Sequence, residues 1–224
     1  MLRLFLPFSG KLYKVRMFMF NKNNEYYELA ADFGDVALDT LTDSEVIEAV
    51  PFLGLGYKAA KAVGSIPDRL FIKKLTKFIE QIESVSDSEK SEQLNRLKKD
   101  KHRERIGTTL MLVLNNLTEL IKAEILARIF IKYLRDEITV DEFFRLSHAT
   151  DKCYVNDLSR LASYANKSTS NPTVGWSLLS AGLAENVGMD MATSTNLQSG
   201  KTFFKLTNIG RIMNGIILEM ENDN

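Results

Sequence analysis

Several residue types that define familiar classes of protein are scarce in this chain of 224 residues. It has one cysteine, Cys153, so an intrachain disulfide is excluded, and the reducing cytoplasm is the simplest compartment to expect. Its two histidines, His102 and His148, are too scattered to form a spaced set of metal ligands with that cysteine. We therefore expect neither a disulfide framework nor a metal centre.

A net charge is also lacking, because 29 basic residues balance 29 acidic ones. Dedicated nucleic-acid-binding proteins usually carry a basic excess, since their affinity comes largely from displacing counterions from phosphates. With 45% hydrophobic and 26% charged residues, the composition is that of an ordinary globular protein. The balance argues against nucleic-acid binding by the chain as a whole, although a local patch stays compatible with it.

Long hydrophobic runs are missing too. The longest apolar stretch, residues 46–63, is interrupted by Glu48, Pro51, Lys58 and Lys61, whereas a spanning helix needs about 20 nearly uninterrupted apolar residues. We expect this stretch to pack as a helical hairpin, and the alternative is contact with a membrane surface or a partner. The residues that would make this contact are Phe52, Leu53, Leu55 and Tyr57.

The N-terminal residues are apolar but resemble no signal peptide, because a long apolar region and a small-residue cleavage site do not follow. We expect residues 1–24 to be poorly ordered.

Catalytic motifs are absent from the sequence. His148 and Cys153 lie five residues apart, so they need not face each other, and we expect core or half-buried structural roles for both histidines. Neighbouring acids such as Asp141 and Glu142 point apart on a helix, and caps or solvated faces explain them. No glycine-rich phosphate loop is present. The sequence therefore favours a protein without enzymatic activity and without a cofactor.

What the chain does contain is helical periodicity. Apolar residues recur at spacings of three and four over 25–41, 65–82, 103–117 and 119–134, which predicts helices there. Further helices are predicted at 44–50, where Pro51 ends the helix, at 54–64, which is rich in small residues, and at 89–101, which is polar and exposed. Ser65 is a predicted N-cap, Thr139 with Glu142 forms a capping-box pattern, and Leu158, Leu161 and Tyr164 indicate a further helix. We predict an all-α body over 25–165, with the strongly apolar helix 103–117 at its centre.

The character changes over residues 166–224. A polar turn precedes a short helix at 173–181 that ends at Gly182, and strands are predicted at 183–187 and 202–206. Thr207 caps a final amphipathic helix. This order of helix, strand, loop, strand and helix predicts a winged-helix-like unit with a small β-hairpin.

Two stretches carry a resemblance. The sequence LLSAGL at 178–183, followed by FKLTNIG at 204–210, resembles the ending of bacterial winged-helix proteins, in which the wing returns into an LT-x-x-G pattern. Together with SIPDRLFIKKL at 65–75 and the segments 51–64 and 127–161, the chain resembles a loosely defined set of uncharacterised bacterial helical proteins. Some of these are similar to abortive-infection, or phage-defence, accessory proteins, and no catalytic motif comes with the resemblance.

A basic run is the strongest charge signal. Residues 96–105 contain six basic residues against Asp100 and Glu104, a local charge of six minus two, or plus four. They are Arg96, Lys98, Lys99, Lys101, Arg103 and Arg105. A solvated helix junction is the simpler explanation, and contact with nucleic acid, anionic lipid or an acidic partner is the alternative.

The predicted winged unit lacks the charges that DNA recognition needs. Helix 173–181 and loop 188–200 contain no Lys or Arg, whereas each phosphate contact requires a cation. We therefore favour a non-enzymatic bacterial interaction protein, an accessory or sensor in phage defence, with a protein partner. The alternatives are a membrane-acting effector that uses segment 46–63 and a nucleic-acid-binding regulator that uses residues 96–105.

Overall fold

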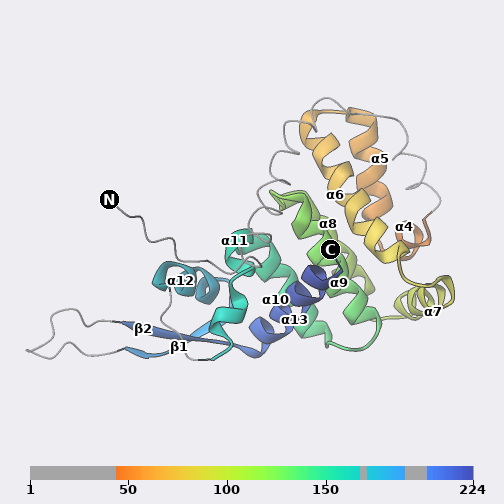
Figure 1. Cartoon of the computed structure of the whole chain (residues 1–224). Coiled ribbons are helices and arrows are strands. Elements are labelled where there is room, and N and C mark those ends of the chain that lie inside the picture. The colour runs from red at the N-terminus through yellow and green to blue at the C-terminus, as the bar shows by residue number, and fades with distance from the viewer. Residues whose placement is uncertain (1–43, 167–170, 190–200, 224) are drawn as a thin grey trace, which may run out of the picture.

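The computed structural model describes residues 44–166, 171–189 and 201–223, which are mainly helical with one small antiparallel sheet (Figure 1). The expectations for residues 1–24 and for a helix at 25–41 lie outside the described residues, as does most of loop 188–200. The elements are α4 (Glu45–Ala49), α5 (Leu53–Val63), α6 (Ile66–Glu83), α7 (Asp87–Leu97), α8 (Arg103–Asn116), α9 (Leu120–Leu134), α10 (Val140–Lys152), α11 (Val155–Leu158), a 3-10 helix (Leu161–Tyr164), α12 (Pro172–Ser180), β1 (Ala184–Met189), β2 (Thr202–Leu206) and α13 (Asn208–Asn222).

Three helices begin at N-cap side chains that the sequence predicts. Ser65 opens α6, where its hydroxyl accepts from the backbone N–H of Asp68 and the Asp68 carboxylate accepts from the Ser65 N–H. Thr139 and Glu142 form the same reciprocal pair at α10, and Thr207 caps α13. These bonds satisfy backbone donors that the first turn of a helix leaves free, so the predicted starts are confirmed.

Helix α9 lies at the centre of the described helices. Its buried residues occupy nearly its whole circumference, and α6, α7, α10 and α13 all pack against it. The sequence-based prediction that helix 103–117 is central is wrong, because α8 leaves Leu112 58% exposed. Apolar residues on the outer side of α8 made it appear more buried than it is.

The prediction of one helix carrying Leu158, Leu161 and Tyr164 is also wrong in its geometry. All three side chains are buried, but α11 ends at Leu158 and a 3-10 helix follows at Leu161–Tyr164. A constant spacing of three residues matches the 3.0 residues per turn of a 3-10 helix rather than the 3.6 of an α-helix.

The small sheet follows the short helix α12, as expected. Gly182 ends α12 with a φ of 75°, while the Leu183 N–H donates to the Leu178 carbonyl at 2.8 Å and the Gly182 N–H donates to the Leu179 carbonyl at 2.9 Å. This pair of bonds is a Schellman motif, whose left-handed residue favours glycine. Strand β1 then pairs antiparallel with β2, with a bulge between Asn186 and Gly188.

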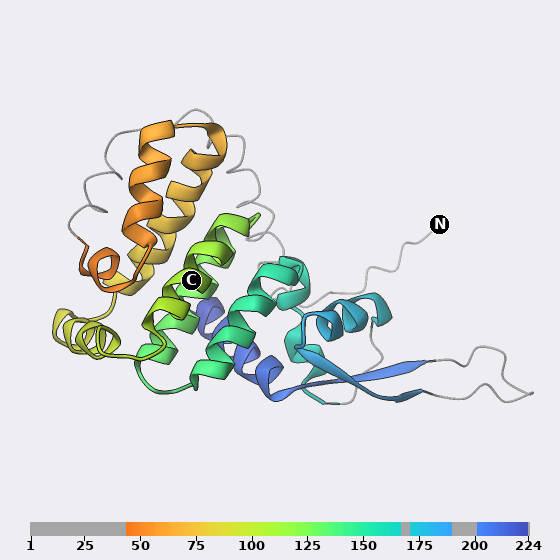
Figure 2. The same cartoon turned by 180° about the vertical axis from the view of Figure 1, so that it is seen from behind.

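The described elements share one hydrophobic core. Helix α13 returns from the hairpin and packs on α9 and α10, with Met213 and Ile216 fully buried. Ion pairs join α13 to α9 as well, since Lys132 lies 3.0 Å from Glu219. The predicted boundary at residue 166 is therefore not a break in the core. The paired helices α5 and α6 project at one end, and the β1–β2 hairpin extends at the other (Figures 1 and 2).

Candidate interaction surfaces

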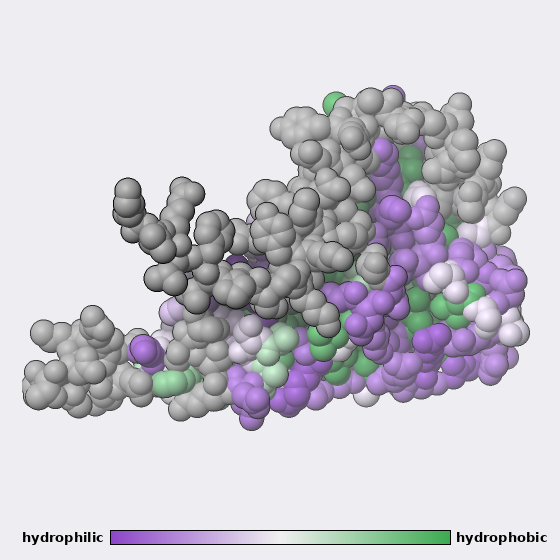
Figure 3. All heavy atoms as spheres, viewed as in Figure 1, coloured by the Kyte–Doolittle hydropathy of each residue, from purple (hydrophilic) through white to green (hydrophobic). Residues whose placement is uncertain are grey.

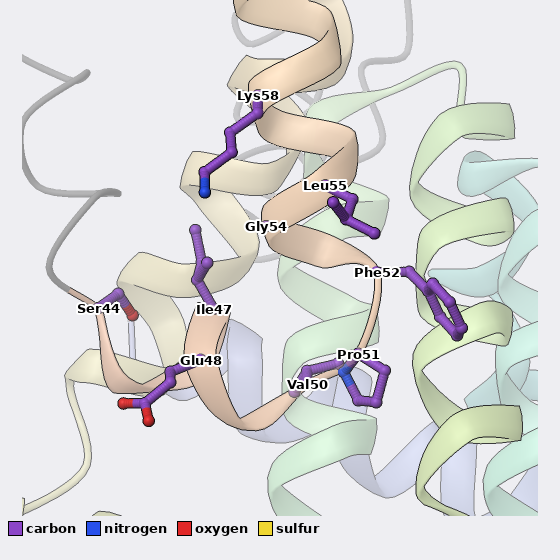
Figure 4. Close-up of a pocket in the computed structure, with 9 residues that line it drawn as sticks. All are labelled: Ser44, Ile47, Glu48, Val50, Pro51, Phe52, Gly54, Leu55 and Lys58. Atoms are coloured by element: carbon purple, nitrogen blue, oxygen red, sulfur yellow. The ribbon is translucent and has the colours of Figure 1, made fainter.

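The predicted contact segment forms a shallow pocket where α4 meets α5 (Figure 4). The pocket has a volume of about 610 Å³. It is lined by Ser44, Ile47, Glu48, Val50, Pro51, Phe52, Gly54, Leu55 and Lys58. Glu48 and Lys58 bring charge to this lining, while Ile47, Phe52 and Leu55 are among its apolar side chains.

The four predicted contact residues of this segment divide into two pairs. Leu53 and Tyr57 are buried in the core, whereas Phe52 is 43% exposed and Leu55 is 68% exposed. The reason is the helical period, which turns residues four apart toward the body and leaves their neighbours outside. Leu53 and Tyr57 thus cannot contact a membrane or partner in this fold, and Phe52 and Leu55 remain available.

Phe52 has an unusual backbone conformation. Its φ is 69° at the N-cap of α5, in the left-handed region that bulky side chains rarely adopt. The neighbouring loop is held close to α8, because a Cβ on Gly107 would lie 2.5 Å from the Pro51 carbonyl oxygen. This tight approach fixes the α4–α5 junction, and in Figure 4 the Phe52 ring points toward α8.

The basic run is largely engaged within the protein. The Arg103 Nε–H donates to the Ala49 carbonyl at 2.9 Å, and an Arg96 Nη2–H donates to the Leu134 carbonyl at 2.6 Å. Each arginine therefore satisfies a carbonyl at the C-terminal end of another helix, where the helix dipole favours a cation. The Arg105 guanidinium lies over the Phe144 ring at 4.0 Å from its centroid.

The remaining residues of the run are three lysines. Lys98 lies 3.6 Å from Glu48 as an exposed pair, and Lys99 and Lys101 are exposed on the short connection between α7 and α8. Five of the six basic residues are thus exposed, and three of these five, Arg96, Lys98 and Arg105, also contact other residues of the chain. The basic run and segment 46–63, predicted separately, thus meet in space, and Arg103 holds the two together.

A further surface lies on α12, and sequence reasoning did not single out its central residue. Trp176, the one tryptophan of the chain, is 49% exposed and meets the Phe204 ring edge-on, with centroids 5.1 Å apart. Thr173 and Ser180 are exposed on the same face of α12, at spacings of three and four from Trp176. We call these three residues the Trp176 surface. A lone tryptophan on an uncharged helix was the signal that could have found it.

The charges near the Trp176 surface do not favour a polyanion. Residues 171–189 and 201–223 contain Lys201, Lys205 and Arg211. They also contain Glu185, Glu219, Glu221 and Asp223, so the balance is three minus four, or minus one. Arg211 donates to the Leu206 carbonyl at 3.0 Å.

The residues first considered for catalysis do not come together. Cys153 is buried at the C-cap of α10, and burial raises the pKa of its thiol to about 12. A thiol of this kind is almost entirely protonated at neutral pH.

His148 is exposed on the same helix as Cys153, so the expectation of a buried or half-buried role is wrong for His148. His102 is half-buried, as expected. Among the described residues, no three His, Cys, Asp or Glu side chains gather in a way that could hold a metal ion.

Lys74 of α6 is a buried cation. It is 7% exposed, and its Nζ donates to the carbonyls of Asn115 at 2.8 Å and Leu117 at 2.9 Å, at the C-terminal end of α8. Burial lowers the pKa of Lys74 to about 8. Its alkyl stem packs in the core while its ammonium group caps α8, which is a structural role.

In the described ranges, no helix combines the length and apolarity needed to cross a membrane.

Comparisons with protein-family models, with curated proteins and with solved structures found no match for this chain.

Proposed function

We propose that this chain is a non-enzymatic protein-interaction module whose partner binds the Trp176 surface. The observation that carries the proposal is the half-exposed Trp176 on a face of α12 that has no charged residue. Tryptophan is enriched among residues that dominate binding energy at protein interfaces, and charged residues are depleted at the centres of such interfaces. Uncharged Thr173 and Ser180 flank it, which suits a protein rather than a phosphate backbone.

The aromatic contacts beneath Trp176 support its use as an anchor. Phe204 is fully buried and contacts both Trp176 and Tyr164 edge-on. A Cβ on Gly175 would lie 2.4 Å from the Phe204 ring, so α12 sits directly on this ring. A pre-positioned aromatic side chain loses little conformational freedom on binding.

Within this proposal, the unit from α12 to α13 is a winged-helix-like fold adapted to protein contact. The order of α12, β1, β2 and α13 supports this assignment, as does the resemblance of residues 178–183 and 204–210 to bacterial winged-helix proteins. The resemblance to abortive-infection proteins supports an accessory or sensor role in bacterial phage defence. A single, buried cysteine fits a cytoplasmic location.

Site-specific photocrosslinking tests the proposal in cells. A photoreactive phenylalanine analogue at position 176 is expected to capture a discrete protein partner, with and without phage infection. The same analogue at position 52 is the matched control, since Phe52 is similarly exposed but lies at the α4–α5 junction. Trp176→Ser in the tagged full chain should lose that partner on co-purification, while Phe52→Ser should retain it.

Two outcomes would overturn this assignment. One is a chain that purifies as a solitary monomer in both conditions and captures nothing at position 176. The other is tight DNA binding in low salt that Lys201→Glu abolishes, because this would mean that the unit binds the phosphate backbone of DNA.

A further inference from the structure

The turn between α5 and α6 exposes the two most solvent-accessible large apolar side chains of the described residues. Val63, at the end of α5, is 74% exposed, and Ile66, at the start of α6, is 75% exposed. Leu70 follows one turn later along α6 and is also exposed. Because α5 and α6 project from the other helices, this turn stands at one end of the described structure (Figures 1 and 2). We call residues 58–73 the α5–α6 tip.

The backbone of the tip is fixed by local bonds. Gly64 ends α5 with a φ of 66°, and Ser65 and Asp68 form the capping box of α6. The Arg69 Nε–H donates to the Gly64 carbonyl at 3.0 Å, which closes the turn from the other side. Val63 and Ile66 are thus held outward by the turn, so they do not need an unfolding step to become accessible.

Positive charge is concentrated around these apolar residues. Residues 58–77 contain six basic residues and one acidic residue, Asp68, a balance of six minus one, or plus five, in a chain of zero net charge. Lys74 is buried, and Lys77 is half-buried with its Nζ 3.1 Å from Glu80. Lys58, Lys61 and Arg69 are exposed, and Lys73 is half-buried. At 1.5 Å per residue, these four residues lie within about 11 Å of the turn along the helix axes, close to one Debye length.

We propose that the α5–α6 tip docks on an anionic membrane surface, with Val63 and Ile66 entering the interface and the basic residues contacting lipid headgroups. Anionic lipids attract basic groups near the surface, and exposed apolar side chains add affinity by leaving water. A phosphate backbone would use the cations but would give Val63 and Ile66 no apolar environment. On the face seen in Figure 3, hydrophilic side chains, drawn in purple, predominate among the described residues, with hydrophobic ones in green between them.

This inference differs from insertion of segment 46–63. That segment contributes Val46, Val50 and Leu53 to the core, so its insertion would require α4 and α5 to leave the body. The tip, in contrast, acts with the fold intact and lies away from the Trp176 surface. It goes beyond the proposed protein interaction and does not depend on it.

Flotation with vesicles at low ionic strength tests the inference on the full chain. The protein is expected to float with vesicles of phosphatidylcholine and phosphatidylserine in a ratio of about three to one, and not with phosphatidylcholine alone. Lys58→Glu with Lys61→Glu should weaken binding about 25-fold or more, since each basic residue near the surface contributes about fivefold. Val63→Ser with Ile66→Ser should weaken binding about tenfold or more while leaving the net charge unchanged.

Matched controls come from exposed residues elsewhere. Lys99→Glu with Lys101→Glu makes the same change of charge, and Leu112→Ser with Leu218→Ser makes the same kind of apolar loss; both should bind as the unmodified chain does. Circular dichroism of each variant verifies that it is folded.

Failure of the unmodified chain to float with anionic vesicles would overturn the inference, as would unchanged binding by the Val63→Ser, Ile66→Ser variant. Oligonucleotide binding that only the Lys58→Glu, Lys61→Glu variant loses would assign the tip to nucleic acid instead.

Discussion

Arg103 shows how a basic side chain becomes structural through a distant contact. Its guanidinium group donates to the Ala49 carbonyl at 2.9 Å and to the Glu48 carbonyl at 3.5 Å, at the end of α4. Arg103→Met keeps the alkyl stem and removes both donors, so it should lower the free energy of unfolding by about 1–3 kcal/mol. Lys101→Met, an exposed neighbour, should change it by less than about 0.5 kcal/mol. Urea denaturation measures both, and equal, small effects would mean that Arg103 is only a surface charge.

Lys74 leads to a prediction about pH. Burial lowers its pKa in the folded chain to about 8, against 10.5 in the unfolded chain. Between these values the unfolded chain binds the proton that the folded chain has lost, so the contribution of Lys74 to stability rises with pH. The advantage of the unmodified chain over Lys74→Met should therefore grow by about 2 kcal/mol from pH 8 to pH 10.

Urea denaturation of the unmodified chain and of Lys74→Met across this pH range tests the prediction. Taking the difference between their free energies of unfolding removes the contribution of groups that titrate in the same way in both proteins. Lys58→Met provides the control for loss of a lysine, because Lys58 is exposed. A constant difference for Lys74→Met would show that its ammonium group titrates as an exposed lysine does.

At the scale of elements, two glycines in helices make a matched pair. A Cβ on Gly107 of α8 would lie 2.5 Å from the Pro51 carbonyl oxygen, whereas nothing lies within 4 Å of a Cβ on Gly215 of α13. Gly107→Ala should therefore destabilise the protein by about 1–3 kcal/mol, because α8 would push the α4–α5 junction away. Gly215→Ala should stabilise it by about 0.5–1 kcal/mol through helix propensity. Thermal or urea melts distinguish the two, and stabilisation by Gly107→Ala would contradict the close packing described here.

The elements that sequence reasoning predicted well are those whose signals are local. Ser65, Thr139 and Thr207 bond to backbone groups three residues away, so their positions in the sequence are sufficient to place helix starts. Gly182 ends α12 for an equally local reason. The strand at 202–206 was predicted with its observed bounds, and Thr202, Phe204 and Leu206 are buried at every second position.

The candidate sites were less predictable because their residues depend on distant partners. Arg103 bonds to a carbonyl 54 residues earlier, and Lys74 bonds to carbonyls more than 40 residues later, so neither role leaves a local pattern. The same limit applies to Phe52, whose left-handed backbone depends on the packing of the preceding loop against α8. Leu53 and Tyr57 were predicted as contact residues, but apolar character alone does not tell the buried side of a helix from the exposed side.

At the scale of the whole molecule, the two proposed surfaces lie at opposite ends. The α5–α6 tip projects at one end, while α12 and the hairpin lie at the other, with α8, α9 and α10 between them (Figures 1 and 2). Both ends belong to the same hydrophobic core, which extends from Val46 to Met220. A membrane and a protein partner could therefore be bound at the same time without competing for one face.

A continuous core predicts that the chain unfolds as one unit. Trp176, the only tryptophan, reports on the C-terminal end through its fluorescence, and far-UV circular dichroism reports on all the helices. The two signals should give the same urea midpoint, because α13 packs on α9 and α10 and is tied to α9 by the Lys132–Glu219 pair. Ile216→Ala, at a fully buried position, should remove about 2–5 kcal/mol and shift both midpoints equally. Two results would mean that residues 166–224 fold as a separate domain. In one, the tryptophan fluorescence changes at a lower urea concentration than the circular dichroism; in the other, Ile216→Ala shifts only the fluorescence midpoint.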